Sequence, residues 1–391
     1  MPHYTGAALT PAEAACYPRH TLTAVNAAIL KEDAMTRTQL TRRAWLGGAA
    51  AVAATATGPF IWTRRASAAG KVVIRTIGGS YEEANVKAIF EPFTKATGIE
   101  VVKVPASLGK LLAMYESGNI ELDIVDAGEL GLLSLQQKGA LDTIDYKSWK
   151  LTNPEDMDHR RDTMVADIYF STVLGYNTQV FPTGKHPKSW AEFWDLKKFP
   201  GPRMLTDLAA GAIDVEFALL ADGVPKDKLY PIDVDRAFKS LDRVRPSIRK
   251  FWDTGALSAQ MLADKEVVLG SIWNGRLQAV ADKGAPLAIE WNEAALQVQF
   301  WGIMKGAKNL ENAQRFIEFA CQPQIQAAHA GLIPYGPTNR AAFKHIKPEV
   351  AARLPSAPEQ KQKAFLHSAQ WWADNRSKVS ERWSQWLLQK G

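Results

Sequence analysis

Four consecutive residues in the second half of the chain carry side chains suited to holding a small ligand. An apolar run from 267 to 272 ends in Trp-Asn-Gly-Arg at 273–276, which is the pattern of a buried strand followed by a turn. The tryptophan offers a flat aromatic face, the asparagine an amide, and the arginine a guanidinium that can bind a carboxylate through paired hydrogen bonds. We therefore expect Trp273, Asn274 and Arg276 to contact a small ligand.

A second tryptophan and four acidic residues extend the chemistry of this expected site. The aromatic faces of Trp273 and Trp301 can cover an alkyl chain or attract an ammonium group, at about 0.5–2 kcal/mol each. Each candidate acid could instead cap a helix or lie in a solvated loop. The acids that could pair with such an ammonium are Asp126, Glu129, Asp207 and Asp214.

Alternating strands and helices must position these side chains. From residue 70 onward the sequence predicts strands at 72–77, 99–104 and 122–125, each followed by a turn and an amphipathic helix. This order predicts an α/β fold with a mostly parallel sheet, in which ligands bind at the carboxyl ends of the strands. A second α/β unit begins with a strand at 203–207. The candidates at the first set of strand ends are Gly79, Ser80, Tyr81, Ser107, Asp126 and Glu129.

Length, charge and motifs exclude several classes of protein. A chain of 391 residues with 46% hydrophobic residues is long enough for two domains. Lys plus Arg number 47 against 41 for Asp plus Glu, but no basic run is interleaved with aromatic residues, so nucleic acid is not an expected partner. The histidines lack zinc-ligand spacing, and phosphate-loop, dinucleotide and nucleophile-elbow motifs are missing. We therefore expect no metal, no cofactor and no catalysis.

Residues 1–68 are predicted to be a leader region. A twin-arginine pattern at Arg42 and Arg43 precedes a short apolar stretch and a small-residue cleavage site at 66–68. The apolar stretch is shorter than the ~20 residues that a membrane span needs, which favours cleavage over a retained anchor. Met35 is the expected true start, and export by the twin-arginine pathway to the periplasm is the expected route.

Short motifs occur along the whole mature chain. Besides the turn at 273–276 they are Lys-Ala-Thr-Gly-Ile-Glu at 95–100, Gly-Tyr-Asn at 175–177, Ser-Trp-Ala-Glu-Phe-Trp at 189–194, Gly-Ala-Lys-Asn at 306–309 and Gly-Pro-Thr-Asn at 336–339. In their order and spacing these motifs resemble the spermidine/putrescine-type family of solute-binding proteins from ABC importers, which also contains 4-aminobutyrate binders.

The resemblance implies a two-lobed type II periplasmic-binding-protein fold with a ligand cleft between the lobes. It implies that the chain first crosses between lobes at about 171–176, which would place Tyr169 and Ser171 in the cleft. Further crossings are expected at about 302–305 and after Asn339. The implied protein is a monomeric receptor that presents its ligand to the permease and ATPase subunits of an inner-membrane importer. The expected lobes comprise residues 70–171 with 305–340, and residues 172–304 with 341–391.

Position 276 bears on which ligand the resemblance implies. Putrescine-binding members carry an acidic residue three positions after the tryptophan, whereas this chain has Arg276. A guanidinium there would repel a second ammonium and favour a carboxylate. An amino acid such as 4-aminobutyrate is therefore the expected ligand, and a polyamine is the alternative. Enzymes of the thiamin-pyrimidine synthase type share the two-lobed architecture and are a more remote alternative, as is a structural envelope protein.

Overall fold

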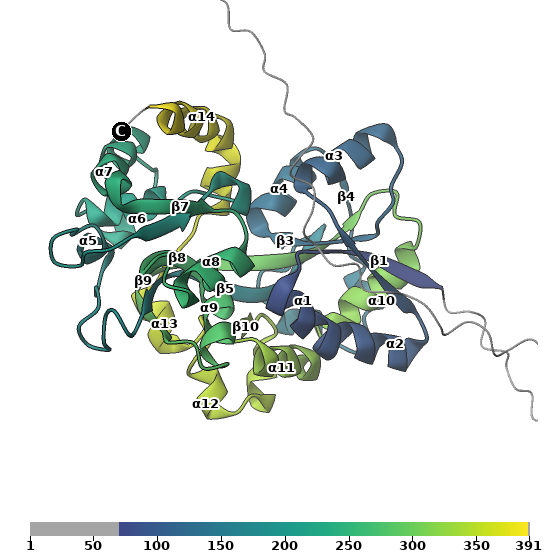
Figure 1. The fold of residues 1–391 in the computed structure, drawn as a ribbon. Coiled ribbons are helices and arrows are strands. Elements are labelled where there is room, and N and C mark those ends of the chain that lie inside the picture. Colours follow the sequence, from purple (N-terminus) through teal and green to yellow (C-terminus); the bar gives the residue numbers. More distant parts are fainter. Residues whose placement is uncertain (1–69, 390–391) are drawn as a thin grey trace, which may run out of the picture. The chain divides into compact units, whose positions relative to one another are not determined.

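The computed structural model describes residues 70–389, which form one mixed sheet flanked by helices (Figure 1). The expected leader, with its twin-arginine pattern and Met35, lies outside the described residues. Among residues 70–389, no helix has both the length and the apolar composition needed to cross a membrane.

Eight strands form the main path of the 11-stranded sheet, in the order β2-β1-β3-β9-β5-β8-β6-β7. Three two-residue strands join at its sides, where β4 (Leu141–Asp142) and β11 (Phe365–Leu366) pair with β9, and β10 (Gly336–Pro337) pairs with β5. The main strands are β1 (Lys71–Thr76), β2 (Glu100–Pro105), β3 (Ile124–Gly128), β5 (Met164–Asn177), β6 (Arg203–Thr206), β7 (Ile248–Trp252), β8 (Leu269–Trp273) and β9 (Leu287–Met304).

Helices connect and cover these strands. A π-helical turn, Val86–Phe90, links the first two α-helices, and short 3₁₀ turns punctuate the loops at 146–148, 154–156, 208–210, 226–228, 245–247 and 340–345. The α-helices are α1 (Gly79–Asn85), α2 (Glu91–Thr97), α3 (Leu108–Ser117), α4 (Glu129–Gln137), α5 (Trp190–Phe193), α6 (Val215–Ala221), α7 (Val234–Val244), α8 (Gly255–Ala263), α9 (Asn274–Ala281), α10 (Leu310–Ala320), α11 (Pro323–Leu332), α12 (Pro348–Ala351), α13 (Pro358–Lys363) and α14 (Ala369–Leu388).

The two ends of the sheet are parallel, as the alternation of strands and helices predicts. β1 pairs in parallel with β2 and β3, and β6 pairs in parallel with β7 and β8. The strands predicted at 72–77, 99–104 and 122–125 correspond to β1, β2 and β3 within about three residues at each end. The predicted α/β class is therefore confirmed, and the carboxyl ends of several strands are brought to the same edge.

Two long antiparallel strands occupy the middle of the sheet. β5 is buried along all of its length, and β9 pairs with it from Leu287 to Gly302 with register shifts. The first part of β5 lies between β9 and the short strand β10, whereas its residues from Thr172 onward pair with β8. Continuous apolar runs such as that of β5 are typical of strands covered on both faces.

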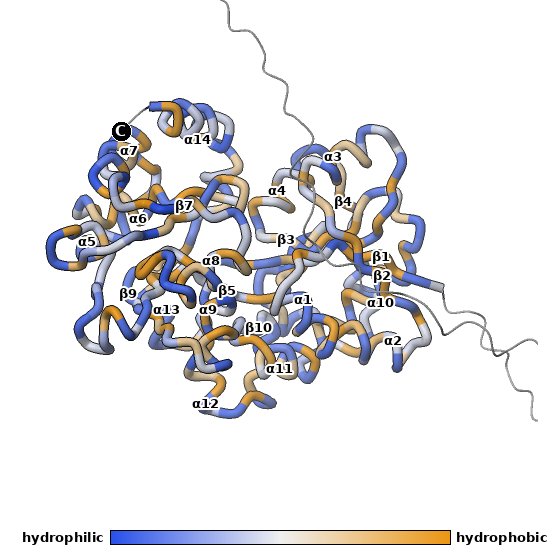
Figure 2. The backbone as a smooth tube through the Cα atoms, in the orientation of Figure 1, coloured by the Kyte–Doolittle hydropathy of each residue, from blue (hydrophilic) through white to orange (hydrophobic). Residues whose placement is uncertain are grey.

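The apolar core is divided into several clusters rather than one. One cluster joins α2, β3, β9 and α10, and contains Phe93, Trp301 and Phe316. Another joins α5, α6, α7 and α14, and contains Trp190 and Trp372. Along the helices hydrophobic positions alternate with hydrophilic ones (Figure 2), which is the pattern of helices that bury one face.

Candidate ligand-binding site

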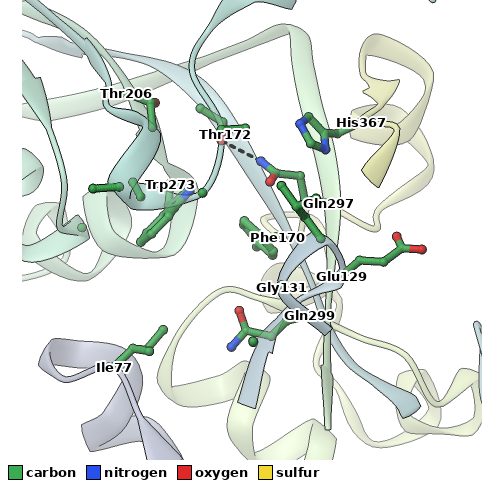
Figure 3. Close-up of a pocket in the computed structure, with 18 of the residues that line it drawn as sticks. Ile77, Glu129, Gly131, Phe170, Thr172, Thr206, Trp273, Gln297, Gln299 and His367 are labelled. Carbon is green, nitrogen blue, oxygen red and sulfur yellow. Dashed lines mark hydrogen bonds between the residues drawn. The ribbon is translucent and has the colours of Figure 1, made fainter. Parts of the chain in front are cut away.

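A cavity of about 460 Å³ lies at the shared edge formed by the strand ends (Figure 3). Its walls come from the turns that follow β1, β2, β3, β6, β7 and β8, from the middle of β5 and β9, and from the segment that leads into α14. This volume falls within the range of roughly 300–1,000 Å³ that is typical of small-molecule sites. The predicted contact residues that line the cavity are Gly79, Ser107, Glu129, Asp214, Trp273 and Arg276.

Arg276 reaches the cavity from the first turn of α9, directly after β8. Its side chain is 4% exposed, and its Nη1 donates a hydrogen bond to the carbonyl of Gly78 at 3.1 Å and lies 3.5 Å from Oγ of Ser80. Its Nε is buried and has no hydrogen-bond partner within residues 70–389. The guanidinium therefore lies against the start of α1 and bonds uncharged oxygens there.

Two glycines make room for this arginine. A Cβ on Gly79 would lie 2.6 Å from Nη1 of Arg276, and Gly79 has a φ of +64°, which side chains other than that of glycine rarely adopt. A Cβ on Gly255, at the start of α8, would lie 2.8 Å from both Cγ of Arg276 and Cε3 of Trp273. The backbone of α1 and α8 thus holds the guanidinium closely from two sides.

Trp273 forms an aromatic wall of the cavity. The ring is half-buried and makes edge contacts with Trp252, at 5.0 Å between centroids, and with Phe170, at 6.2 Å. Phe170 also lines the cavity (Figure 3). Edge-to-face packing of this kind fixes ring orientation, so the indole face of Trp273 has a defined position.

Asp214 lies where β6 and β8 end. Its Oδ2 accepts hydrogen bonds from the backbone N–H of Thr206 and from Oγ of Ser271, both at 2.6 Å. Burial nevertheless raises the pKa of Asp214 to about 6, because the charged form loses its hydration. The site therefore contains a carboxylate that is negative near pH 7 but close to protonation, beside the aromatic wall.

The other acids of the cavity wall are engaged by the protein or by solvent. Glu129 forms an ion pair with Arg161. Glu216 is buried and accepts hydrogen bonds from the hydroxyl of Tyr230 at 2.8 Å and from Nε1 of Trp372 at 2.7 Å, and burial raises its pKa. Asp253 is solvent-exposed.

Tyr81, Asp126 and Ser80 lie behind the cavity wall. Nε2 of Gln299, which lines the cavity, donates hydrogen bonds to the hydroxyl of Tyr81 at 2.9 Å and to the carboxylate of Asp126. The Tyr81 hydroxyl donates to Asp167 at 2.9 Å. Burial raises the pKa of Asp126 to about 6. These residues orient Gln299 and Arg276 rather than facing the cavity themselves.

The residues of β5 that line the cavity each lie one position after the residues predicted to do so. Phe170 and Thr172 line it, whereas Tyr169 and Ser171 point to the opposite face of the strand, because side chains alternate along a strand. The Tyr169 hydroxyl donates to Asp158 at 3.1 Å, and the backbone N–H of Ser171 donates to the side chain of Asn274. The structure thus corrects the expected positions of Tyr169 and Ser171.

Three further predicted residues make structural contacts outside the cavity. Asn274 is fully buried and joins α9 to the backbone of β5 and to the carbonyl of Pro334. Asp207 caps a 3₁₀ turn by accepting the N–H of Ala209 at 2.8 Å. Trp301 is fully buried in the core against Phe316 of α10, with centroids 5.5 Å apart, so its aromatic face is covered by protein.

Several cavity residues were not predicted. The alternation of polar residues along β9 could have indicated Gln297 and Gln299, since both belong to the same face of the strand. Nothing in the local sequence indicates that Arg75, Arg376 or His367 reaches the site, because the sheet order and the path of α14 bring them there. The residues missed include Arg75, Phe170, Thr172, Thr206, Glu216, Gln297, Gln299, His367 and Arg376.

A mixed sheet with a ligand-sized cavity at its strand ends defines a protein that binds small molecules. A family model for bacterial extracellular solute-binding proteins matches residues 88–359, and the chain belongs to this family. It is 32% identical over 322 residues to a gamma-aminobutyric acid-binding protein of Pseudomonas aeruginosa, which covers 81% of this chain and 90% of that protein. It is 27% identical to a spermidine/putrescine-binding periplasmic protein of Escherichia coli, over 74% of this chain and 88% of that one.

Solved structures give the same result. An ABC transporter substrate-binding protein from Bradyrhizobium japonicum is 38% identical, with a TM-score of 0.75 over 82% of this chain and 100% of that one. The Atu4243–GABA receptor is 34% identical, with a TM-score of 0.74 over 82% of this chain and 98% of that one. The predicted resemblance to ABC solute-binding proteins is therefore confirmed.

Proposed function

We propose that the protein is the ligand receptor of an ABC importer and that it binds a small amino acid with one ammonium and a carboxylate, of which 4-aminobutyrate is the reference. The observation that carries this proposal is Arg276, which lines the cavity and forms no ion pair with any carboxylate in residues 70–389. The relatives named for gamma-aminobutyric acid support the same ligand class.

The carboxylate of the ligand is assigned to Arg276. A guanidinium has five N–H donors in a planar fork and cannot lose its proton at neutral pH. Nη1 of Arg276 donates hydrogen bonds to the uncharged oxygens of Gly78 and Ser80, and the Arg276 side chain also makes a hydrogen bond with the side chain of Tyr335. Asp126 attracts Arg276 from behind the cavity wall, and a ligand carboxylate would provide the direct ion-pair partner for this partly desolvated group.

The ammonium is assigned to Asp214 and Trp273. Asp214 lies close to the end of β8, because its Oδ2 accepts a hydrogen bond from Ser271. Ser271 precedes Trp273 by two residues on that strand. A carboxylate and an aromatic face together favour an ammonium group. Binding there would also stabilise the charged form of Asp214, whose pKa burial has raised to about 6.

A polyamine is the alternative ligand, since a spermidine/putrescine-binding protein is among the relatives. A second ammonium would have to lie in a cavity that Arg276 lines, and like charges in a partly desolvated space repel each other. Glu129 and Glu216 are already engaged by Arg161 and by Tyr230 with Trp372. This arrangement favours a ligand with a carboxylate.

The proposal includes two lobes that close around the ligand. We assign residues 70–171 with 305–340 to lobe one and residues 172–304 with 341–391 to lobe two. Residues 299–303 of β9 pair with β3, a strand of lobe one, which supports moving the second crossing from 302–305, and the lobe boundary with it, to about residue 299. Closure would be a population shift driven by ligand contacts to both lobes.

The cellular setting also belongs to the proposal. We assign residues 1–68 to a twin-arginine leader, and the mature protein to the periplasm as a monomer that presents its ligand to a permease and an ATPase. Membership in a family of bacterial extracellular proteins supports this location. No catalysis is assigned, and recovery of the bound ligand chemically unchanged after long incubation would support a receptor over a thiamin-pyrimidine-type enzyme.

Reversal of charge at position 276 tests the proposed ligand chemistry. Arg276→Asp should lower the affinity for 4-aminobutyrate at least a hundredfold, because an acid replaces the buried charged partner of the ligand carboxylate. Putrescine should then bind more tightly than 4-aminobutyrate. Arg249→Asp, which makes the same charge change at an exposed position of β7 that does not line the cavity, is the control and should change the preference far less. Calorimetric affinities for both ligands decide the test, and an unchanged preference in Arg276→Asp would contradict it.

A further inference from the structure

Three guanidinium groups line the same cavity. Binding of one ligand carboxylate would leave at least one of them without an ionic partner. Arg75, Arg276 and Arg376 are all cavity residues. None of them takes part in an ion pair in the part of the chain that the structure describes. Burial lowers the pKa of Arg75 and Arg376, yet a guanidinium stays protonated in proteins. Asp126, which lies behind the cavity wall, attracts both Arg75 and Arg276. Burial is the cause that lowers the pKa of Arg376, and a ligand carboxylate would supply an ionic partner for this third guanidinium.

The arginines form two separate groups in the fold. Arg75 ends β1, where its Nε donates to the carbonyl of Ala106 at 2.7 Å and its Nη1 donates to the carbonyl of Asp126. Arg276 bonds the carbonyl of Gly78, three residues further along the same turn. These two guanidiniums therefore belong to the wall formed by the β1–α1 turn.

Arg376 belongs to a different wall. It projects from α14, and its nitrogens donate to the carbonyls of Leu208 and Gly211 in the turn that follows β6. Residues 209–212 of that turn line the cavity beside it. These bonds use two of the five N–H donors of the guanidinium, which leaves donors for a ligand.

None of the acids that line the cavity forms an ion pair with these arginines in the described part of the chain. Glu129 is neutralised by Arg161, and Asp253 lies at the solvent-exposed rim. Glu216 is satisfied by Tyr230 and Trp372 and lies 3.6 Å from the ring of His367. Asp214 is the acid already assigned to the ammonium of the ligand.

The remaining lining groups between the two walls are neutral. Burial lowers the pKa of His367 to about 4, so its ring is uncharged near pH 7. Nε2 of Gln297 donates to the hydroxyl of Thr172 at 2.7 Å, and both side chains face the cavity together with His367 (Figure 3). The cavity thus has one acid for an ammonium and two cationic walls separated by polar, uncharged groups.

We propose that the ligand is an amino dicarboxylate, with one carboxylate on Arg276 and Arg75, the ammonium on Asp214, and a second carboxylate on Arg376. This assignment rests on the proposed function and narrows its ligand class. Arg376 becomes a specificity-determining residue, because it is the group that distinguishes a ligand with two carboxylates from one with a single carboxylate.

Matched pairs of amino acids test the assignment. Glutamate, 2-aminoadipate and 2-aminopimelate each differ by one carboxylate from 4-aminobutyrate, 5-aminovalerate and 6-aminohexanoate. Calorimetry on the purified protein should give at least one dicarboxylate that binds tenfold or more tightly than its partner. Equal or tighter binding by every monocarboxylate would overturn the second carboxylate site and leave the proposed function standing. Absence of binding by all six compounds, with putrescine binding instead, would overturn both.

Substitution of Arg376 identifies the residue responsible. Arg376→Gln should lower the affinity of the preferred dicarboxylate at least tenfold and leave that of the matched monocarboxylate within about twofold. Arg376→Lys, which keeps the charge, should retain most of the discrimination. If Arg376 only holds the turn at 208–211, both ligands will lose affinity equally in Arg376→Gln, and the proposal fails. Thermal unfolding of each variant confirms that the comparison is made on folded protein.

Discussion

The position of Arg276 depends on the absence of side chains around it. Gly79 contributes a left-handed backbone conformation and the space that Nη1 occupies, and Gly255 contributes space beside Cγ. A buried guanidinium can be held this closely only where backbone carbonyls and glycine Cα atoms replace side chains. The cationic part of the site is thus determined by residues that carry no functional group.

Gly79→Ala should therefore affect both stability and ligand binding. A methyl group at this position would meet Nη1 of Arg276 at 2.6 Å, and a residue with φ near +64° costs roughly 1–3 kcal/mol when it is not glycine. We expect a loss of that size in the free energy of unfolding, measured in urea, and at least a fivefold loss of affinity for 4-aminobutyrate.

Gly331→Ala is the matched control for this substitution. Gly331 is an exposed residue of α11, and a Cβ there would meet no atom within 4 Å. Alanine is the better helix former by up to about 1 kcal/mol, so this variant should be as stable as the original protein or more so, with unchanged affinity. Equal behaviour of the two variants would show that Gly79 does not position Arg276.

If Asp214 binds the ammonium as proposed, we expect ligand affinity to depend on pH. Its pKa is raised by burial to about 6, so a fall in pH from 7 to 5 protonates most of the carboxylate and should weaken an ammonium-bearing ligand about tenfold. The unliganded protein responds with the opposite sign. A raised folded-state pKa gives a contribution to stability that is full below the unfolded value near 4 and is lost as pH rises through 6.

Asp214→Asn isolates this contribution. Asp126, whose pKa burial also raises to about 6, is present in both proteins, so the difference between their pH profiles belongs to Asp214. Affinity for 4-aminobutyrate measured at pH 5 and pH 7 should differ less in the variant than in the original protein. The same pH dependence in both would exclude Asp214 as the ammonium partner.

At the scale of secondary structure, the parts of the site that follow strand ends could be predicted from the sequence. Gly79, Glu129 and Trp273 end or follow strands that the sequence marks by apolar runs, and all three line the cavity. The carboxyl ends of parallel strands lie at one edge of a sheet, and this is independent of the order of the strands. Local pattern was sufficient here because topology leaves those residues little freedom.

The long central strands were harder to predict. The apolar run of β5 is buried on both faces, so no alternation of hydrophobic and polar residues indicates which side chains face the ligand, and Tyr169 was chosen in place of Phe170. β9 extends without a break from Leu287 to Met304, and none of the strand patterns described above predicts it. Trp301 is buried because α10 packs against it. A contact between segments that are separate in the sequence cannot be predicted from a short stretch of residues.

The last helix could not be assigned to the site from sequence at all. Arg376 belongs to α14, whose tryptophans pack into the cluster around α5, α6 and α7. Arg376 follows Trp372 by four residues and so lies on nearly the same face of the helix, and that packing brings it to the turn after β6. A contact between residues about 165 positions apart follows from tertiary structure alone.

At the scale of the whole described chain, family membership and chemistry agree on a receptor. The fold, the 460 Å³ cavity and the unpaired arginines require no reaction to explain them. The relatives include binders of a zwitterion and of polyamines. Membership in the family therefore does not determine the net charge of the ligand. In the proposed function Arg276 separates the two, because a guanidinium at the cavity favours a ligand carboxylate over a second ammonium.

Competition between 4-aminobutyrate and putrescine tests whether Arg276 determines the charge of the preferred ligand. Calorimetric titration of the purified, unsubstituted protein with 4-aminobutyrate, in the absence and presence of excess putrescine, measures which ligand the cavity prefers. We expect 4-aminobutyrate to bind saturably. Putrescine should displace it only weakly, because the guanidinium of Arg276 repels a second ammonium. Tighter binding of putrescine than of 4-aminobutyrate would contradict this expectation and would show that the guanidinium does not determine the charge of the ligand.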